Sequence, residues 1–168
     1  MNASARRIIG VDPGSRKTGY GVIDCENDRF RLVASGVIAP DTKTEMAVRL
    51  VAIGNALAEI VDEFRPTAGA VENVFLSVNA RSALTLGQAR GVAVYVLGSR
   101  GLDVSEISAR EVKLAVTGHG AAEKSEVGRM VKLLLGMEKL PREDEADALA
   151  VAIAFSRNLI PSRLRIIQ

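Results

Sequence analysis

The feature that most constrains this chain is a carboxylate at the end of a short apolar run. Asp12 closes the run 8–11 and is followed at once by a turn-forming Pro-Gly pair. Such a run is typical of a buried strand, and an ionised carboxylate there costs several kcal/mol unless it is paired or bound to a metal ion. Glu72 ends a second apolar run in the same way, and Asp147 interrupts a long apolar stretch near the C-terminus. We therefore interpret the three acids as parts of one shared site.

Hydrophobic periodicity predicts an α/β fold. Three strands with short loops between them, 8–11, 18–23 and 30–38, are typical of an antiparallel meander. The remaining predicted elements are a helix at 47–64, a strand at 68–71, a helix at 79–97, a strand at 104–107, and helices at 109–116, 122–135 and 143–157. The strand at 68–71 follows a helical crossover, so we expect it to lie parallel to the first strand, 8–11. The order predicts a mixed five-stranded sheet flanked by helices. Asp12 and Glu72 then end neighbouring strands, at the edge where open α/β sheets bind ligands.

Length and composition favour one globular domain. The 168 residues can bury a sizeable core, and we expect a single domain over 1–168 with flexible ends at 1–7 and 159–168. No apolar run approaches the ~18 residues of a membrane span, and no signal-peptide core follows the N-terminal arginines. One Cys and one His exclude a Cys/His zinc site. We expect a cytoplasmic protein that does not contact a membrane.

The charge balance is compatible with nucleic acid. The net charge is only +2, but the sequence pI is about 8.9. If several carboxylates are gathered in one site, the rest of the surface is more basic than the net charge implies, as in proteins that bind nucleic acid. An ordinary, mildly basic protein is the alternative.

The last predicted helix opens with a cluster of acids. Asp144 and Asp147 are three residues apart and share a helix face. Acids in a first turn also complement the helix dipole, which is a sufficient role for Glu143 and Glu145. It does not suit Asp147, because the next eight residues are all apolar. A helix that is apolar on every side is buried, so Asp147 should face a cation.

Gathering these carboxylates in one place predicts a metal site. Close carboxylates repel one another unless a cation relieves the charge, and oxygen ligands suit magnesium and manganese. Two such ions about 3.5–4 Å apart can catalyse the in-line hydrolysis of a phosphodiester. Structural calcium binding is the alternative, although the EF-hand spacing is lacking.

A few residues near these acids could hold a nucleic acid. Phe75 follows Glu72 by three residues and could stack on a base or wedge a base step open, or it could pack in the core. Basic residues around the Gly-His-Gly segment, namely Arg110, Lys113 and Lys124, could bind phosphates, or they could lie on a solvated face. We expect His119 to be a solvated loop residue.

Together these segments resemble the RuvC family of crossover junction endodeoxyribonucleases, which are Holliday junction resolvases. The resemblance runs from about Ile8 to Phe155. Its most specific parts are GVDPGSRKTGYG at 10–21, VENVF at 71–75, LGQARGV at 86–92, AEKS at 122–125 and DEADALA at 144–150. It implies an RNase H-like fold, a homodimer, and paired, symmetric, magnesium-dependent incisions in four-way DNA junctions during recombination and repair. It also implies cooperation with the branch-migration complex of RuvA and RuvB.

The resemblance assigns roles residue by residue. The catalytic, metal-ligating acids of the family match Asp12, Glu72, Asp144 and Asp147. They imply Mg²⁺, two ions per active site, with Mn²⁺ as a possible substitute. The residues that match DNA-contacting positions are Phe75, Lys113 and Lys124. Some relatives carry His at the position of Asp144, which is therefore expected to be the most substitutable of the four acids.

Three other functions fit parts of the pattern. An actin-like or sugar-kinase ATPase also opens with a strand, an Asp-x-Gly turn and a strand, but it needs two such domains to enclose a nucleotide. A catalytically silent junction binder would not need all four acids. A related nuclease acting on RNA would share the fold and the acidic site.

Overall fold

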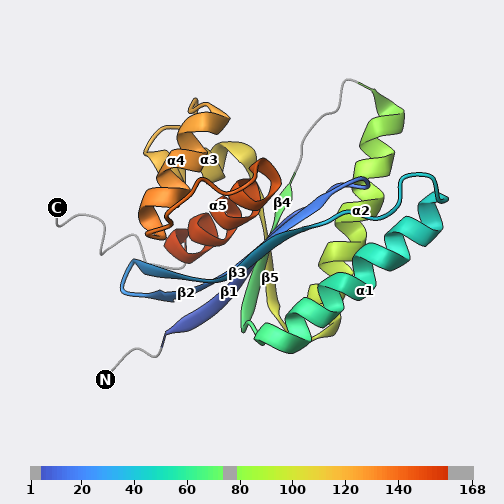
Figure 1. Ribbon diagram of the computed structural model, residues 1–168, viewed down its shortest axis with the longest axis horizontal. Coiled ribbons are helices and arrows are strands. Elements are labelled where there is room, and N and C mark those ends of the chain that lie inside the picture. The colour runs from blue at the N-terminus through green and yellow to red at the C-terminus, as the bar shows by residue number, and fades with distance from the viewer. Residues whose placement is uncertain (1–4, 74–78, 159–168) are drawn as a thin grey trace.

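The computed structural model describes residues 5–73 and 79–158, so Phe75 lies outside the described residues. Five strands form one sheet in the order β3-β2-β1-β4-β5, with helices on both of its faces (Figure 1). The strands are β1 (Arg6–Asp12), β2 (Thr18–Glu26), β3 (Arg29–Ile38), β4 (Ala68–Asn73) and β5 (Asp103–Ser108). The helices are α1 (Met46–Phe64), α2 (Ala80–Ser99), α3 (Ala109–Thr117), α4 (Lys124–Leu134) and α5 (Glu143–Asn158). The mixed five-stranded sheet predicted from the sequence is confirmed.

Strand pairing brings two of the predicted acids to one edge of the sheet. The strands β1, β2 and β3 pair antiparallel, as a meander. The strands β1 and β4 pair parallel, with Val11 opposite Val71. Asp12 and Glu72 follow this last pair directly, so they lie side by side at the carboxyl ends of neighbouring strands. This is the arrangement that the sequence predicted.

The sheet separates the hydrophobic core into two layers, one on each face. The helices α1 and α2 cover one face of the sheet, and α3, α4 and α5 cover the other (Figure 1). Ile9 and Leu57 are fully buried in the first layer, and Leu149 and Ile153 in the second. The helix α5 is buried continuously from Ala148 to Ser156, as its apolar sequence predicted. Among the described residues, no helix is both long and apolar enough to cross a membrane.

Three glycines allow α5 to lie directly on the sheet. A Cβ atom at Gly10 would lie 2.5 Å from the backbone nitrogen of Ala152, and one at Gly21 would lie 2.6 Å from Leu149 Cδ2. A Cβ atom at Gly19 would overlap the backbone oxygen of Asp144. Real Cβ atoms do not approach other atoms this closely. Bare backbone at these three positions therefore lets the first turns of α5 lie beside Asp12.

The N-terminal strand begins earlier than the sequence predicted. Arg6 and Arg7 were expected in a flexible end over 1–7, but both belong to β1. Arg7 donates hydrogen bonds to the two carboxylate oxygens of Asp24 at 2.7 and 3.1 Å and one to the backbone oxygen of Phe64 at 2.9 Å. Apolar alternation cannot reveal a strand end held by charged side chains, because the arginines carry no apolar signal.

A capping box joins β5 to α3. Ser108 caps α3 in a capping box with Glu111, whose carboxylate accepts the Ser108 backbone N–H at 2.8 Å. Ser108 is also the last residue of β5. The capping box therefore fixes the direction in which α3 leaves the sheet edge, next to Asp12 and Glu72.

Candidate active site

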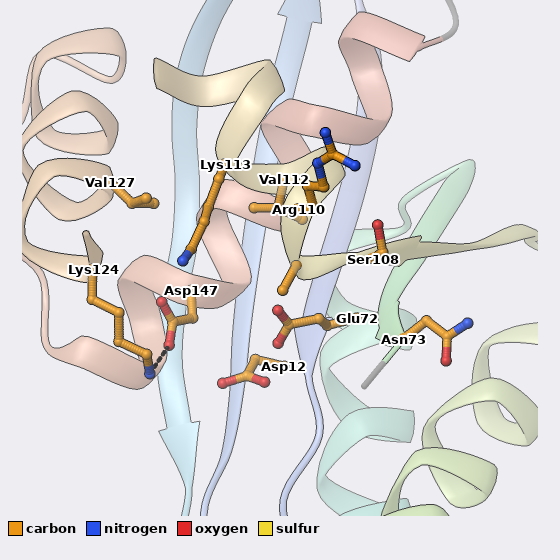
Figure 2. Close-up of a pocket in the computed structure, with 11 residues that line it drawn as sticks. Asp12, Glu72, Asn73, Ser108, Arg110, Val112, Lys113, Lys124, Val127 and Asp147 are labelled. Atoms are coloured by element: carbon orange, nitrogen blue, oxygen red, sulfur yellow. Dashed lines mark hydrogen bonds and ion pairs between the residues drawn. The ribbon is translucent and has the colours of Figure 1, made fainter. Parts of the chain in front are cut away.

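A cleft of about 440 Å³ opens at the carboxyl edge of β1 and β4 (Figure 2). Three carboxylates line it, from Asp12, Glu72 and Asp147. Its other lining residues come from the ends of β4 and β5 and from α3 and α4: Asn73, Ser108, Ala109, Arg110, Val112, Lys113, Lys124 and Val127. Residues more than 130 positions apart in the chain thus meet in one cleft, because α5 returns across β1.

The turn that follows Asp12 is closed by a buried hydroxyl. Thr18 is fully buried, and its hydroxyl group donates a hydrogen bond to the backbone oxygen of Gly14 at 2.8 Å. The Thr18 hydroxyl oxygen in turn accepts the Gly14 backbone N–H at 3.2 Å. This reciprocal pair ties both ends of the turn together. It fixes the backbone immediately after Asp12.

Asp12 is in an environment that disfavours its charged form. Burial raises its pKa, and a hydrogen bond with Glu72 and the negative charges of Glu72 and Asp147 raise it further. Lys124 opposes the rise, but the pKa of Asp12 still reaches about 8. A cation bound next to this carboxyl group would stabilise its charged form, because positive charge would offset both the repulsion and the cost of burial.

Asp147 faces the cation that its apolar surroundings predicted. Its Oδ2 atom lies 3.1 Å from the Nζ atom of Lys124, which lies 2.9 Å from Oε1 of Glu143 (Figure 2 shows the contact with Asp147). Burial raises the pKa of Asp147, although the hydrogen bond from Lys124 acts in the opposite direction. The pKa of Lys124 is raised, first by its hydrogen bond to Glu143. One lysine therefore bridges two carboxylates of α5.

Asp144 is placed differently from the other three acids. It lies one turn before Asp147 on α5 and is not part of the cleft lining. Its Oδ2 atom lies 3.9 Å from the Nζ atom of Lys17, in the turn after β1. Asp144 thus stands beside the cleft, next to a lysine of the turn that follows β1.

Basic residues also line the cleft. Lys113 lines the cleft, and its amino group points into it on the side of Asp147 (Figure 2). Among the described residues this amino group has no hydrogen-bond or ion-pair partner. Arg110 also lines the cleft, but its guanidinium group points away from the three acids (Figure 2). His119 lies outside the lining, half exposed, and contacts Glu126 at 2.8 Å, which agrees with its interpretation as a loop residue.

Some features of the cleft were not found from the sequence. Asn73 and Ser108 line it. An amide at the end of a strand and a hydroxyl that caps a helix are common in proteins, so the sequence alone does not indicate that they belong to a site. Glu143 was interpreted only as a complement to the helix dipole, whereas it also binds Lys124. The spacing of four between Glu143 and Asp147 is the signal that could have indicated a shared partner.

The donor set fits a hard divalent cation. Carboxylate oxygens are the ligands that magnesium and manganese prefer. Burial, first, and the negative charges of Glu72 and Asp147 raise the pKa of Asp12, and a bound cation would oppose both effects. Within the described ranges, no three acidic, histidine or cysteine side chains converge closely enough to hold one ion. Asp147 is hydrogen-bonded to Lys124 instead.

Comparison with known proteins identifies the family. Residues 8–155 match the family model described as crossover junction endodeoxyribonuclease RuvC. The crossover junction endodeoxyribonuclease RuvC of Geobacter sulfurreducens is 47% identical over 154 residues, which cover 92% of this chain and 94% of that protein. The protein of the same name from Francisella philomiragia is 49% identical over 146 residues, covering 87% and 85%.

Solved structures agree with the sequence comparison. T. thermophilus RuvC in complex with a Holliday junction substrate superposes with a TM-score of 0.85 at 32% identity, covering 90% of this chain and 93% of that one. The yeast mitochondrial Holliday junction resolvase has a TM-score of 0.63 at 13% identity, a likeness of fold alone. These matches confirm the RNase H-like fold that the resemblance implied. The chain belongs to the RuvC family of crossover junction endodeoxyribonucleases.

Proposed function

We propose that this protein is a magnesium-dependent endonuclease that resolves four-way DNA junctions by paired, symmetric incisions during recombination and repair. The observation that carries the proposal is the cleft itself. Three carboxylates from β1, β4 and α5 lie in it, together with Lys113, which has no ion-pair partner among the residues that the structure describes. Membership of the family supports the choice of DNA junctions as substrate, since the similar T. thermophilus protein has been captured with one.

The proposed metal ligands are Asp12, Glu72, Asp144 and Asp147. When bound, one or two Mg²⁺ ions, or Mn²⁺ in their place, would help form the attacking hydroxide and neutralise charge on the phosphate. The negative charges of both Glu72 and Asp147 act on Asp12 and raise its pKa, which supports Asp12 as a ligand shared with both. Asp144 would have to turn from Lys17 toward the cleft to take part.

The lysines of the cleft have a complementary role in this proposal. Lys113 points into the cleft (Figure 2) and has no carboxylate partner within residues 5–73 and 79–158, so its amino group can contact a phosphate oxygen. A fixed positive charge at that place stabilises the negative charge that develops as the phosphodiester bond breaks. Lys124 is held next to Asp147 and would contact the same phosphate or its neighbour.

The remaining elements of the proposal concern assembly. A four-way junction has near two-fold symmetry, and a homodimer with C2 symmetry would present two equal sites to opposite strands. The family also supports action in the cytoplasm together with the branch-migration complex of RuvA and RuvB. Phe75 follows β4 by two residues, and we propose that it contacts bases at the crossover.

Incubation with a synthetic four-way DNA junction tests the proposal. We expect paired nicks at symmetric positions with Mg²⁺ or Mn²⁺ and none with a chelator. The Asp12→Asn variant should bind the junction without cutting it. Binding without cutting by the unchanged protein under either metal would contradict the proposal and favour a silent junction binder. Equal cutting of structured RNA would favour the RNA nuclease.

Phe75→Ala tests the aromatic contact separately. We expect weak cutting with near-normal thermal stability, because a side chain that contacts bases is not needed for folding. A large fall in melting temperature would instead place Phe75 in the core.

A further inference from the structure

Lys124 binds two carboxylates that have different surroundings. Its Nζ atom lies 2.9 Å from Glu143 Oε1 and 3.1 Å from Asp147 Oδ2. Asp147 lines the cleft, and its side chain is only 21% exposed. Glu143 lies one turn earlier on α5, outside the cleft lining, and its side chain is 70% exposed. The lysine therefore stands at the boundary between the site and solvent.

We propose that Glu143 is a positioning residue, which keeps the amino group of Lys124 beside the cleft when a divalent cation replaces that amino group at Asp147. Lys124 is then the exchangeable counter-cation of the metal-free site. This inference rests on the proposed metal site. It assigns Glu143 a role beyond that of a helix-capping charge.

Charge repulsion is the physical reason for the exchange. An ammonium group donating to Asp147 and a divalent ion ligated by the same carboxylate would be two close cations, which repel each other. Lys124 must therefore withdraw as the ion binds. Without Glu143, Lys124 would leave Asp147 for water and would then have lost both of the ion pairs described above. With Glu143 already in contact, it keeps one carboxylate partner and stays within reach of the cleft.

The alternative is that Glu143 only stabilises the helix α5. Glu143 lies in the first turn of α5, where a negative charge stabilises the helix. That role predicts a lower melting temperature for Glu143→Gln but no coupling between Glu143 and Lys124 in metal binding. The two roles are therefore separated by a metal-affinity measurement rather than by stability.

Calorimetric titration of the DNA-free protein with Mn²⁺ provides that measurement. Lys124→Met removes the competing cation, and we expect about threefold to tenfold tighter Mn²⁺ binding. Glu143→Gln leaves Lys124 with Asp147 alone, and we expect about threefold weaker binding. In the Lys124→Met background, Glu143→Gln should have no effect. Glu123→Gln is the matched control, because it removes the same charge next to Lys124 in sequence, whereas the ion pairs of Lys124 within the described residues are with Glu143 and Asp147.

Each outcome decides between the alternatives. Weakening by Glu143→Gln that is equal in both backgrounds, or matched by Glu123→Gln, would be a general charge effect and would overturn the inference. If Lys124→Met leaves Mn²⁺ binding unchanged, the inference about Lys124 and Glu143 is overturned, but the proposed metal site is not. Absence of Mn²⁺ binding by the unchanged protein would overturn both. Thermal melting of each variant checks folding, which should persist because both side chains are largely exposed.

Discussion

Gly19 of β2 lies directly beneath the backbone carbonyl group of Asp144, the second residue of α5. Gly19 is also the strand partner of Asp12. The same glycine thus pairs with one acid of the site and supports the backbone of another. Because Gly19 has no side chain, α5 lies close to the sheet at this point. This close packing brings the acids of α5 near the end of β1.

Gly19→Ala should therefore impair both stability and cutting. The new methyl group would overlap the Asp144 carbonyl oxygen, and overpacking of this kind costs about 1–3 kcal/mol. We expect a lower free energy of unfolding in urea and slower junction cutting, because the first turn of α5 must move off the sheet. Gly128→Ala is the control. Gly128 lies within α4 with open space around it, so alanine should stabilise the protein by up to about 1 kcal/mol. Equal stability of the two variants would contradict the close packing.

Asp12→Asn should stabilise the metal-free protein at alkaline pH. The pKa of Asp12 is raised from 3.8 to about 8 in the folded protein, so the folded state binds more protons than the unfolded state between these values. Stability is then lost as the pH rises toward 8. Asparagine carries no charge and avoids that loss, which is at most about 5 kcal/mol at pH 8, because the pKa rises by about four units and each unit is worth about 1.4 kcal/mol.

Urea unfolding in the presence of a chelator, at pH 5 and pH 8, measures this effect. At pH 5 the variant should already be slightly more stable, because the carboxyl group of Asp12 is protonated in the folded state but mostly ionised in the unfolded state. Its advantage should be several times larger at pH 8. Glu138→Gln, an exposed acid outside the cleft, should show no such change with pH. If the Asp12→Asn variant were less stable than the unchanged protein at pH 8, the charged form of Asp12 would not destabilise the folded state, and the prediction would be wrong.

Asp24→Asn should destabilise the protein at neutral pH but not in acid. The hydrogen bond from Arg7 holds the pKa of Asp24 below its usual value, and Arg31 adds to this effect. A lowered pKa contributes stability above the unfolded-state value, and this stability is lost as the pH falls through the folded-state value. We expect a loss of about 1–2 kcal/mol at pH 7, shrinking below about pH 4.

Urea unfolding as a function of pH tests the Asp24 prediction against a matched pair. Asp62 accepts hydrogen bonds from Arg100 at 2.9 and 3.1 Å, a geometry like that of the Arg7–Asp24 pair. Its side chain is 64% exposed, compared with 11% for Asp24. Asp62→Asn should therefore cost less stability. An equal cost would show that burial does not strengthen the Asp24 contact.

Lys113→Ala should slow junction cutting without affecting folding. Its amino group lines the cleft and makes no ion pair within the described part of the chain, so its removal leaves no carboxylate unpaired. Loss of one charge that stabilises the transition state lowers the rate by roughly 10²-fold. Single-turnover cutting and thermal melting measure the two effects. Lys139→Ala, an exposed lysine outside the cleft, should cut normally, and a similar deficit there would point to general charge attraction.

The element order and the sheet edge of the site could be predicted because their signals are local. The run 8–11 and the amphipathic pattern of α1 show their periods in consecutive residues, and a helical crossover fixes the parallel pairing of β1 with β4. Asp12 and Glu72 follow from this topology alone. Asp147 was identified because a charge within a buried helix needs a partner.

What only the tertiary structure decided is which side chains meet across separate elements. The sequence shows that Asp147 requires a cation, but the choice of Lys124, and its sharing with Glu143, depends on how α4 crosses α5. The sequence shows acids at positions 144 and 147 alike, yet only Asp147 lines the cleft, while Asp144 lies by Lys17. The physical reason is that charge pairing acts over a few ångströms of space, and residue spacing specifies such distances only within one element.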